Sequence, residues 1–404
     1  MSHIAAQILF LTSLLGFLGA LNAVRTLDPR RHPLLRPWWL PALTTAELVP
    51  ARVLVHGAVV IAAAAASALD HRAGQWGLWL TGATWLLYVP IQRRAAATRQ
   101  AMAAALVEIG VEAPTPMPIE WRAVALAWPY RLPKDVERVD AVEYAPGLCL
   151  DVYRRRDFEA GSHPALLQVH GGGWRGGNRR QQARPLIRRL TQAGWVCVAI
   201  DYPLVPEATF PDQLVAVKRA LAWMRSEGHE HGIDPGFIAI TGGSAGGHLS
   251  ALAALTPGRP EYQPGFEGAD TTVQAAVPFY GIYDFLNRNA TRDEWPVIPT
   301  GVMKASKSKQ PELFRAASPL DQVNETAPPF LVVHGDTDSV VPPREATQFV
   351  EALESVSGRP VGYALLPGAN HAFDVFESLR AHHAVAGVTA FLTHVLESGR
   401  VDAR

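Results

Sequence analysis

A serine in a glycine-rich turn is the first pattern in this chain that could do chemistry. Residues 242–246 read GGSAG and fit G-x-S-x-G, with Ser244 at the centre. In a sharp turn from a strand to a helix, this pattern exposes the serine hydroxyl as a nucleophile. The apolar run 237–240 precedes the turn and the helical run 245–255 follows it, so its setting is the required one. Taken alone, the motif also fits a structural turn, because the chain contains 33 glycines.

A second glycine-rich loop could stabilise negative charge. Residues 170–174 read HGGGW and follow the short apolar run 165–169. Three successive glycines let the backbone come close to a ligand and direct its N–H groups inward. Such donors can hold the negative oxygen of a tetrahedral intermediate, and losing one costs about 10² to 10³ in rate. A flexible surface loop is the alternative, but its pairing with G-x-S-x-G favours an oxyanion hole.

Candidates for a base and for a carboxylate that orients it lie in the C-terminal part. Asp336 and Asp338 follow the apolar run 330–333, and His371 follows the run 361–366. A serine hydroxyl is a poor nucleophile unless a base activates it, and the base in turn needs an orienting group. The chain order Ser, Asp, His is that of α/β-hydrolases, and differs from the chymotrypsin and subtilisin orders. The residues alone leave both aspartates as candidates.

Alternating strands and helices must position these groups. Short unbroken apolar runs, such as 165–169, 195–200 and 330–333, are typical of strands buried on both faces of a parallel sheet. Apolar residues at helical spacing lie between them, at 214–224 and 346–353. We therefore predict an α/β fold with a mostly parallel central sheet and helices on both faces. Because ligands bind at the carboxyl ends of such strands, the polar motifs stand where chemistry is expected.

The motifs together resemble a known group of enzymes. HGGGW, GGSAGGHL, PFYG, ASPL, HGDTDSVVP and NHAF are similar to bacterial carboxylesterases related to hormone-sensitive lipase. The GxSAGGHL form is closest to the branch that contains feruloyl-esterase-like and kynurenine-formamidase-like enzymes. The resemblance covers roughly residues 140–398. It implies the α/β-hydrolase fold and hydrolysis of esters.

The resemblance also implies a role for particular residues. Ser244 matches the nucleophile, Asp338 the acid and His371 the base. The oxyanion donors match Gly172, Gly173 and Ala245. A small cap is expected at about 285–316, where Trp295 lines the acyl pocket, and Trp174 of HGGGW is expected to contact the substrate. The chain departs from the family pattern at Gly243, where many relatives have Asp, and at Ala216, which replaces an acidic residue.

Residues 1–95 are far more apolar than the rest of the chain. As a helix, residues 4–24 would span about 31 Å, which matches a hydrocarbon core of about 30 Å. The stretches 53–69 and 76–91 are shorter, and the second contains Trp76, Trp79 and Trp85, a residue type common at membrane interfaces. We expect one to three membrane helices. A signal peptide and a soluble helical hairpin are the alternatives, although the chain lacks a basic N-terminus.

The charges beside these stretches indicate an orientation. Positive charge concentrates after the first and third stretches, at Arg25, Arg30, Arg31, Arg36, Arg52, Arg93, Arg94 and Arg99. The positive-inside rule then predicts that the part after residue 92 lies in the cytoplasm, on a bacterial inner membrane. Residues 96–135 are expected to form a linker, with a helix at 95–110 and three prolines after it, and 136–404 the catalytic domain.

Composition excludes other classes of protein. The 37 basic and 37 acidic residues balance, so nothing predicts a nucleic-acid partner. Two cysteines form neither a disulfide framework nor a metal site, and no cofactor or metal is expected. The sequence thus predicts a serine esterase or lipase that acts on acyl esters and contacts membrane lipids. An amidase or arylformamidase, a peptidase on the same fold and a non-catalytic membrane protein are the alternatives, the last the least favoured.

Overall fold

A mostly parallel, eight-stranded sheet forms the centre of the protein. We describe a computed structural model of the chain, which covers residues 1–25, 39–126 and 132–402. The strand order is β1-β2-β4-β3-β5-β6-β7-β8, and every pair from β4 to β8 is parallel. The strands are β1 (Val136–Ala145), β2 (Leu148–Arg155), β3 (His163–Val169), β4 (Val196–Ile200), β5 (Ile233–Gly243), β6 (Ala275–Phe279), β7 (Phe330–Gly335) and β8 (Val361–Leu366).

The fold is that of the α/β-hydrolases, as the sequence predicts, with the mixed sheet mostly parallel. The expected strands are all present, and β1 and β2 add an antiparallel edge that the apolar runs did not indicate. Successive residues of β1 alternate between more and less buried positions, because one face of this edge strand is open to solvent. A search for unbroken apolar runs therefore misses such a strand.

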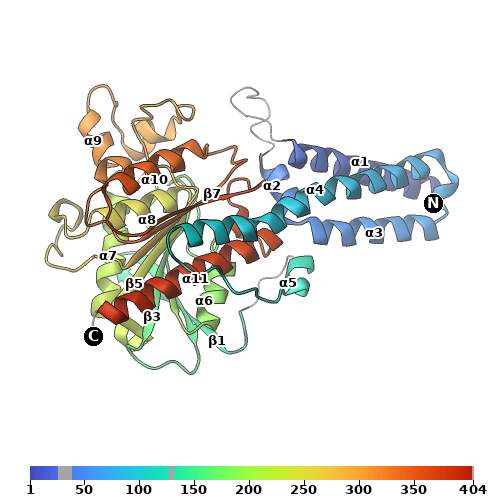
Figure 1. Cartoon of the computed structure of the whole chain (residues 1–404). Helices are drawn as coiled ribbons and strands as arrows, with labels where there is room; N and C mark the ends of the chain where they lie inside the picture. Colours follow the sequence, from blue (N-terminus) through green and yellow to red (C-terminus); the bar gives the residue numbers. More distant parts are fainter. Residues whose placement is uncertain (26–38, 127–131, 403–404) are drawn as a thin grey trace.

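Helices cover both faces of the sheet (Figure 1). One face carries α7 (Asp212–Ser226), α8 (Ala245–Leu255) and α10 (Arg344–Val356), whose apolar residues join one buried cluster. The other carries α6 (Arg184–Gln192), α11 (Leu379–Asp402) and the C-terminal part of α4 (Arg72–Glu108), which join a second cluster. The short helices are α5 (Trp121–Leu126) and α9 (Pro311–Ala316), and a turn of π-helix lies at Ile298–Val302.

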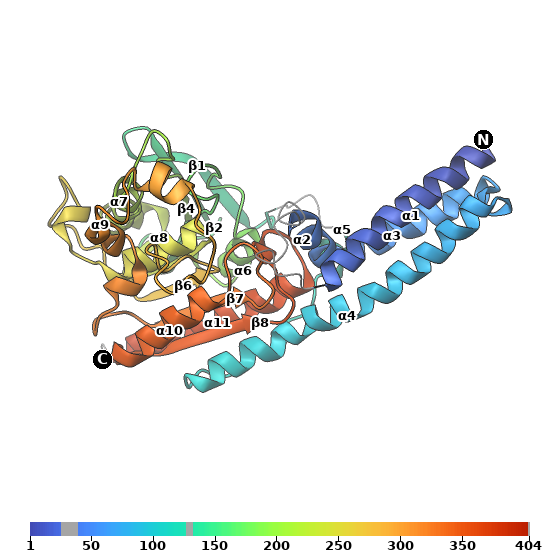
Figure 2. The same ribbon diagram turned by 90° about the horizontal axis from the view of Figure 1, so that it is seen from above.

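The N-terminal helices form an arm that extends from this domain (Figures 1 and 2). The arm contains α1 (Ser2–Val24), α3 (Val49–Ala65) and the first part of α4, and α2 (Trp39–Glu47) lies at its base. Within the described ranges, α1 is the one helix that is long and apolar enough to cross a membrane. The pair α2 and α3, bent by 84°, passes the same test when taken together. Arg30, Arg31 and Arg36 lie outside the described residues.

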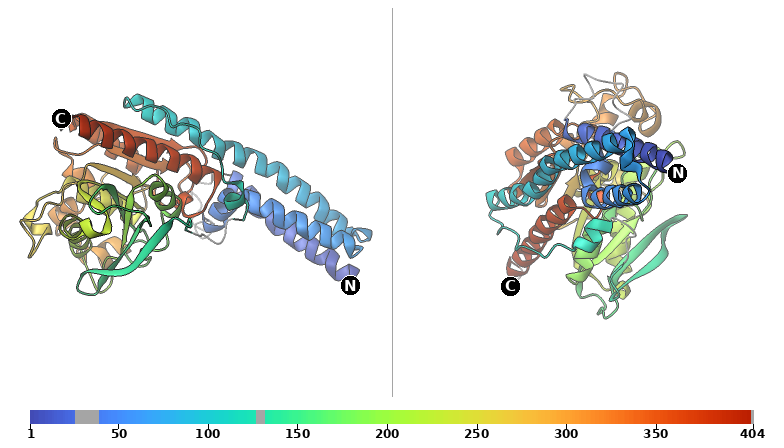
Figure 3. Two further views of the ribbon diagram at one scale, coloured as in Figure 1. Left: turned by 90° about the horizontal axis from the view of Figure 1, so that it is seen from below. Right: turned by 90° about the vertical axis from the view of Figure 1, so that its right-hand side faces the viewer.

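Helix α4 joins the arm to the domain that contains the sheet. The expected third apolar stretch and the expected connector helix are one helix of 37 residues. The predicted boundary at residue 95 therefore falls inside α4, which runs alongside α11 and past β8 (Figure 3). Met102 and Leu106 of this helix are fully buried in the core of the domain. A boundary was expected there because hydropathy falls after Ile91, although the helix itself continues.

Candidate active site

Ser244 stands at the turn between β5 and α8. Its backbone has φ 58° and ψ −117°, a conformation that a residue other than glycine adopts only where the surroundings enforce it. The Ser244 N–H donates to the carbonyl of Phe279 at the end of β6 (3.0 Å). A Cβ atom at Gly246 would lie 2.1 Å from the carbonyl oxygen of Val169, so the start of α8 packs directly against the end of β3. The side chain of Ser244 is partly exposed.

His371 and Asp338 form a buried pair near this turn. His371 Nδ1 lies 2.8 Å from Asp338 Oδ2. Oδ1 of the same carboxylate accepts the N–H groups of Val340 and Val341, each at 2.8 Å. Burial acts to raise the pKa of Asp338, but His371 and His334 outweigh it and hold that pKa well below its usual range. An ionised carboxylate only accepts hydrogen bonds, so His371 Nδ1 donates and Nε2 is left to accept a proton.

Asp336, the other candidate carboxylate, has a different place. Its Oδ1 accepts the N–H of Gly368 at 2.6 Å, which ties the loop after β7 to the loop after β8. Burial raises the pKa of Asp336. Of the two aspartates, Asp338 therefore lies beside the His371 ring. Asp336 instead links the loops that follow β7 and β8.

The glycine loop after β3 is fixed beside the serine turn. The N–H of Gly171 donates to Gln182 Oε1 at 2.7 Å, and a Cβ atom at Gly171 would lie 2.5 Å from the Gly243 carbonyl. Gly172 has φ 123° and Gly173 has φ 62°, so the loop turns back sharply here. A Cβ atom at Gly173 would have no neighbour within 4 Å, so space remains open at this residue. Ala245 begins α8, where the first N–H groups have no partner in the helix.

Tyr280 is a site residue that our reading of the sequence did not single out. Its ring lies 4.7 Å from the His371 ring, centroid to centroid, and the side chain is completely buried. Its hydroxyl donates to Asp374, a carboxyl whose pKa is raised by burial. A Cβ atom at Gly243 would lie 2.6 Å from Tyr280 Oη, so Tyr280 fills the space beside the serine turn. The only signal was that Tyr280 stands in PFYG and Asp374 follows NHAF.

The two tryptophans expected to contact substrate lie in different surroundings. Trp174 is 1% exposed and packs edge-on against the rings of His248 and Phe285, both at 5.4 Å. Its side chain therefore belongs to the core below the glycine loop. Trp295 is partly buried, and the guanidinium of Arg292 lies 5.2 Å from its ring centroid. A role of either tryptophan in substrate binding stays a prediction.

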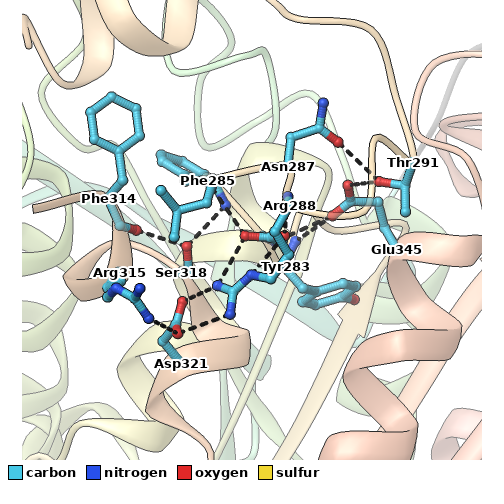
Figure 4. Close-up of polar contacts among 12 residues, drawn as sticks. Tyr283, Phe285, Asn287, Arg288, Thr291, Phe314, Arg315, Ser318, Asp321 and Glu345 are labelled. Atoms are coloured by element: carbon cyan, nitrogen blue, oxygen red, sulfur yellow. Dashed lines mark hydrogen bonds and ion pairs between the residues drawn. The ribbon is translucent and has the colours of Figure 1, made fainter. Parts of the chain in front are cut away.

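A carboxylate of α10 anchors the start of the expected cap (Figure 4). Glu345 Oε2 accepts the N–H groups of Tyr283 and Asp284, each at 3.2 Å, and Oε1 accepts the hydroxyl of Thr291. The buried guanidinium of Arg292 lies 3.3 Å from the same carboxylate. Arg288, between these residues in the chain, bridges Asp284 and Asp321. The start of this segment is thus held by polar contacts, of which those to Glu345 are buried.

The cysteines and acidic residues form no metal site in the part of the chain that the structure describes. Within it, no group of three or more His, Cys, Asp or Glu side chains is placed to hold an ion. Both cysteines are free, and Cys197 is buried, as expected from its apolar surroundings. Burial raises the pKa of its thiol, so it stays protonated.

Comparison with known sequences agrees with this geometry. The BD-FAE family model matches residues 150–353. The probable carboxylic ester hydrolase LipM and the esterases LipQ and LipC, all of Mycobacterium tuberculosis, are 49%, 45% and 38% identical to the chain over 256, 268 and 321 residues. These matches cover 63%, 65% and 76% of this chain. They cover 59%, 63% and 78% of the relatives, so the chain spans about three fifths of the first two.

Solved structures share the fold of the C-terminal part. A truncated carbohydrate esterase from gut microbiota has a TM-score of 0.56 at 23% identity, over 65% of this chain and 98% of its own. Esterase Est2 of Thermogutta terrifontis, with propionate bound, has a TM-score of 0.54 at 24% identity, over 65% and 95%. At these identities the likeness establishes the fold alone.

Proposed function

The chain belongs to the BD-FAE family, and from this we propose that it is a serine hydrolase of carboxylic esters, with Ser244 as the nucleophile. The observation that carries the proposal is the buried His371–Asp338 pair beside a strained serine turn and an open glycine loop. The curated relatives named above are a probable carboxylic ester hydrolase and two esterases. The motifs HGGGW and GGSAGGHL further support a relation to the hormone-sensitive lipase group.

The proposed reaction has two acyl-transfer steps. His371 Nε2 takes the hydroxyl proton of Ser244 while Oγ attacks the ester carbonyl. The N–H groups of Gly172, Gly173 and Ala245 donate to the oxyanion. The alcohol then leaves with the proton from His371, and an acyl group stays on Ser244. A water molecule attacks this acyl-enzyme in the same way, and Asp338 stabilises the imidazolium during both steps.

We infer that the arm attaches the enzyme to a membrane. Large apolar side chains on its surface are open to solvent, including Leu15, Ile61, Trp79 and Leu86, which are each at least 70% exposed. Helix α1 has 23 residues and would span about 34 Å, close to the thickness of a hydrocarbon core. Exposed apolar surface of this extent is rare on soluble proteins and typical of surfaces that face lipid.

Helix α1 packs closely against α4 within the arm. Ser13 and Thr81 form a buried hydrogen bond of 2.8 Å between α1 and α4. A Cβ atom at Gly77 would lie 2.8 Å from Leu9 Cγ and 2.9 Å from the Phe10 backbone nitrogen, so glycine at this position lets the two helices approach closely, as small residues do between membrane helices. These contacts favour a retained anchor over a cleaved signal peptide. We therefore expect membranes washed with alkaline carbonate to keep the full chain, and its release would contradict the anchor.

The arginines of the arm suggest its orientation. Arg94 donates to the Val24 carbonyl at the end of α1 and lies beside Gly368 of the domain that contains the sheet, and Arg52 donates to Thr44 of α2. The N-terminus lies at the far end of the arm (Figure 2). The positive-inside rule then puts the catalytic domain in the cytoplasm, at a bacterial inner membrane. An ester that partitions into the bilayer could reach the active site from this surface, so apolar acyl esters are the proposed substrates.

Hydrolysis of p-nitrophenyl esters tests the proposed reaction. We expect the purified full chain in detergent to hydrolyse esters somewhere in the range from two-carbon to sixteen-carbon acyl groups. Ser244→Ala should lower kcat by about 10³ or more, because the oxyanion donors alone cannot replace the nucleophile. Equal, slow rates for both proteins would contradict an esterase. The chain-length optimum would separate an esterase from a lipase.

A further inference from the structure

A tryptophan of the N-terminal region contacts the ring of the catalytic histidine. Trp39, the first residue of α2, packs edge-on against His371 with 6.2 Å between ring centroids and an interplanar angle of 80°. The two residues lie far apart in the sequence, and α2 reaches the catalytic domain at the base of the arm (Figures 1 and 2). The Trp39 side chain is partly buried, so part of its surface remains open beside the site.

A buried ionic cluster holds α2 at this position. The carboxylate of Glu47, the last residue of α2, accepts hydrogen bonds from Arg380 Nε at 2.8 Å and from the Ser378 hydroxyl at 2.7 Å. The side chains of Glu47 and Arg380 are both fully buried. Burial of a charge is costly unless it is paired with good geometry, so this cluster fixes the relative position of its partners.

The same cluster also holds the loop that carries His371. Arg380 Nη1 donates to the carbonyl of Pro367, just before the loop, and Ser378 lies at its other end. Helix α4 adds a contact, because a Cβ atom at Gly368 would lie 2.8 Å from Arg94 Cδ. Helix α2 and the loop that carries His371 are thus positioned by shared contacts. These contacts also fix the position of Trp39 beside His371.

The chemistry of the base decides which part of an ester lies beside Trp39. In the first step His371 Nε2 must deliver its proton to the oxygen of the leaving alcohol. The alcohol therefore lies against the His371 ring, whereas the acyl carbonyl lies against Ser244 and the glycine loop. We propose that Trp39 is a specificity-determining residue for the alcohol part of the ester, and that it favours alcohols with an apolar or aromatic body. This rests on the proposed function.

Acetates of different alcohols test the proposal with the full chain in detergent. Ethyl, octyl and 2-phenylethyl acetate share the acetyl group and have alcohols of similar acidity, so their rates differ mainly through binding of the alcohol. We expect Trp39→Ala to lower kcat/KM about tenfold for octyl and 2-phenylethyl acetate relative to ethyl acetate, the size of one lost aromatic contact. A kcat limited by hydrolysis of the common acetyl-enzyme should stay unchanged, and Trp39→Phe should restore most of the preference.

Two controls separate this role from a structural one. Trp85→Ala, at an exposed tryptophan of the arm, should leave all three rates unchanged. An equal loss of kcat/KM for all three acetates in Trp39→Ala would mean that Trp39 only supports His371, and would overturn the proposal. Wild-type values of kcat/KM for all three acetates in this variant would overturn it as well.

Labelling of Ser244 tests the inference apart from ester turnover. A p-nitrophenyl phosphonate and a fluorophosphonate with the same phosphonyl group differ only in the leaving group. Trp39→Ala should slow labelling by the aryl reagent about tenfold and leave the fluoride reagent unaffected. Equal effects on the two reagents would overturn the role of Trp39. Absence of acetate hydrolysis by the wild type would instead count against the esterase, and the labelling would still decide on Trp39.

Discussion

His371 Nδ1 lies 2.8 Å from Oδ2 of Asp338, a carboxylate that is completely buried and also accepts two backbone N–H groups. The backbone donors fix the orientation of the carboxylate, and the carboxylate in turn fixes the tautomer and orientation of the imidazole. His371 thus has Nε2 available before substrate arrives, which is the arrangement that the proposed activation of Ser244 requires.

Replacing the carboxylate by an amide should disable the base. Asp338→Asn places an NH₂ group or a weaker acceptor opposite His371 Nδ1, so the imidazole loses its favoured tautomer. We expect kcat to fall by about 10⁴ with little change in KM. Asp336→Asn is the matched control, since its side-chain oxygen can still accept the Gly368 N–H, and it should change kcat less than tenfold. A greater loss in Asp336→Asn would contradict the assignment.

The space beside Gly243 and Ser244 is already filled by Tyr280. A Cβ atom at Gly243 would lie 2.6 Å from Tyr280 Oη, so Gly243→Ala should lower the free energy of unfolding by about 1 to 3 kcal/mol through overpacking. In a Tyr280→Leu background the same substitution should cost little, because the clashing atoms are gone. A double-mutant cycle from denaturant unfolding measures this coupling. Additive costs would contradict the contact.

The buried ion pair between Glu47 of α2 and Arg380 of α11 should contribute more to stability than pairs on the surface. Glu47→Gln leaves the buried Arg380 charge without its partner, and we expect a loss of about 3 to 5 kcal/mol in stability. The double variant Glu47→Leu, Arg380→Met should be more stable than Glu47→Gln. Arg155→Met, which removes the exposed pair with Asp157, should leave the stability close to that of the wild type. Thermal unfolding would compare them, and equal midpoints for Glu47→Gln and wild type would contradict the prediction.

A buried lysine should make stability rise with pH. Burial, together with Arg259, lowers the pKa of Lys218 from 10.5 to about 7, and its Nζ donates to the Thr256 carbonyl. Between these two values the unfolded chain binds more protons than the folded one, so the free energy of unfolding increases with pH. The slope is at most about 1.4 kcal/mol per pH unit.

Thermal unfolding between pH 7.5 and 9 tests this effect. The midpoint should rise with pH in the wild type, and the rise should be absent in Lys218→Met. Lys309→Met, at an exposed lysine, should keep the rise. A slope that survives in Lys218→Met would show that another group causes it.

Sequence reasoning reached the residues that lie in recognisable motifs. Ser244, His371 and the glycine loop each follow a short apolar strand, and parallel strands bring their carboxyl ends to one edge of the sheet. Asp336 and Asp338 could not be separated by their positions in the sequence, because both follow β7. Their hydrogen bonds distinguish them, since Asp338 contacts the His371 ring and Asp336 contacts Gly368.

Contacts between distant segments could not be predicted in this way. Trp39 contacts His371 because α2 packs against the C-terminal domain, although the two residues are more than 300 positions apart in the sequence. No local sequence pattern indicates such a contact. The burial of the Trp174 side chain, with a φ of 58° at this residue, was likewise not visible in the HGGGW motif, and its contact with substrate stays a prediction. The continuity of α4 was also hidden, because hydropathy changes along a helix whose surroundings change from the arm to the sheet.

Direct detection of an acyl group on Ser244 tests the central claim most closely. The full chain is mixed with p-nitrophenyl butyrate, quenched in acid within the first turnover and digested, and the peptides are analysed by mass spectrometry. We predict that the peptide containing Ser244 gains the mass of one butyryl group, and that Ser244→Ala gains none. A butyryl group on another residue, or hydrolysis at the wild-type rate by Ser244→Ala, would contradict the assignment of Ser244 as the nucleophile.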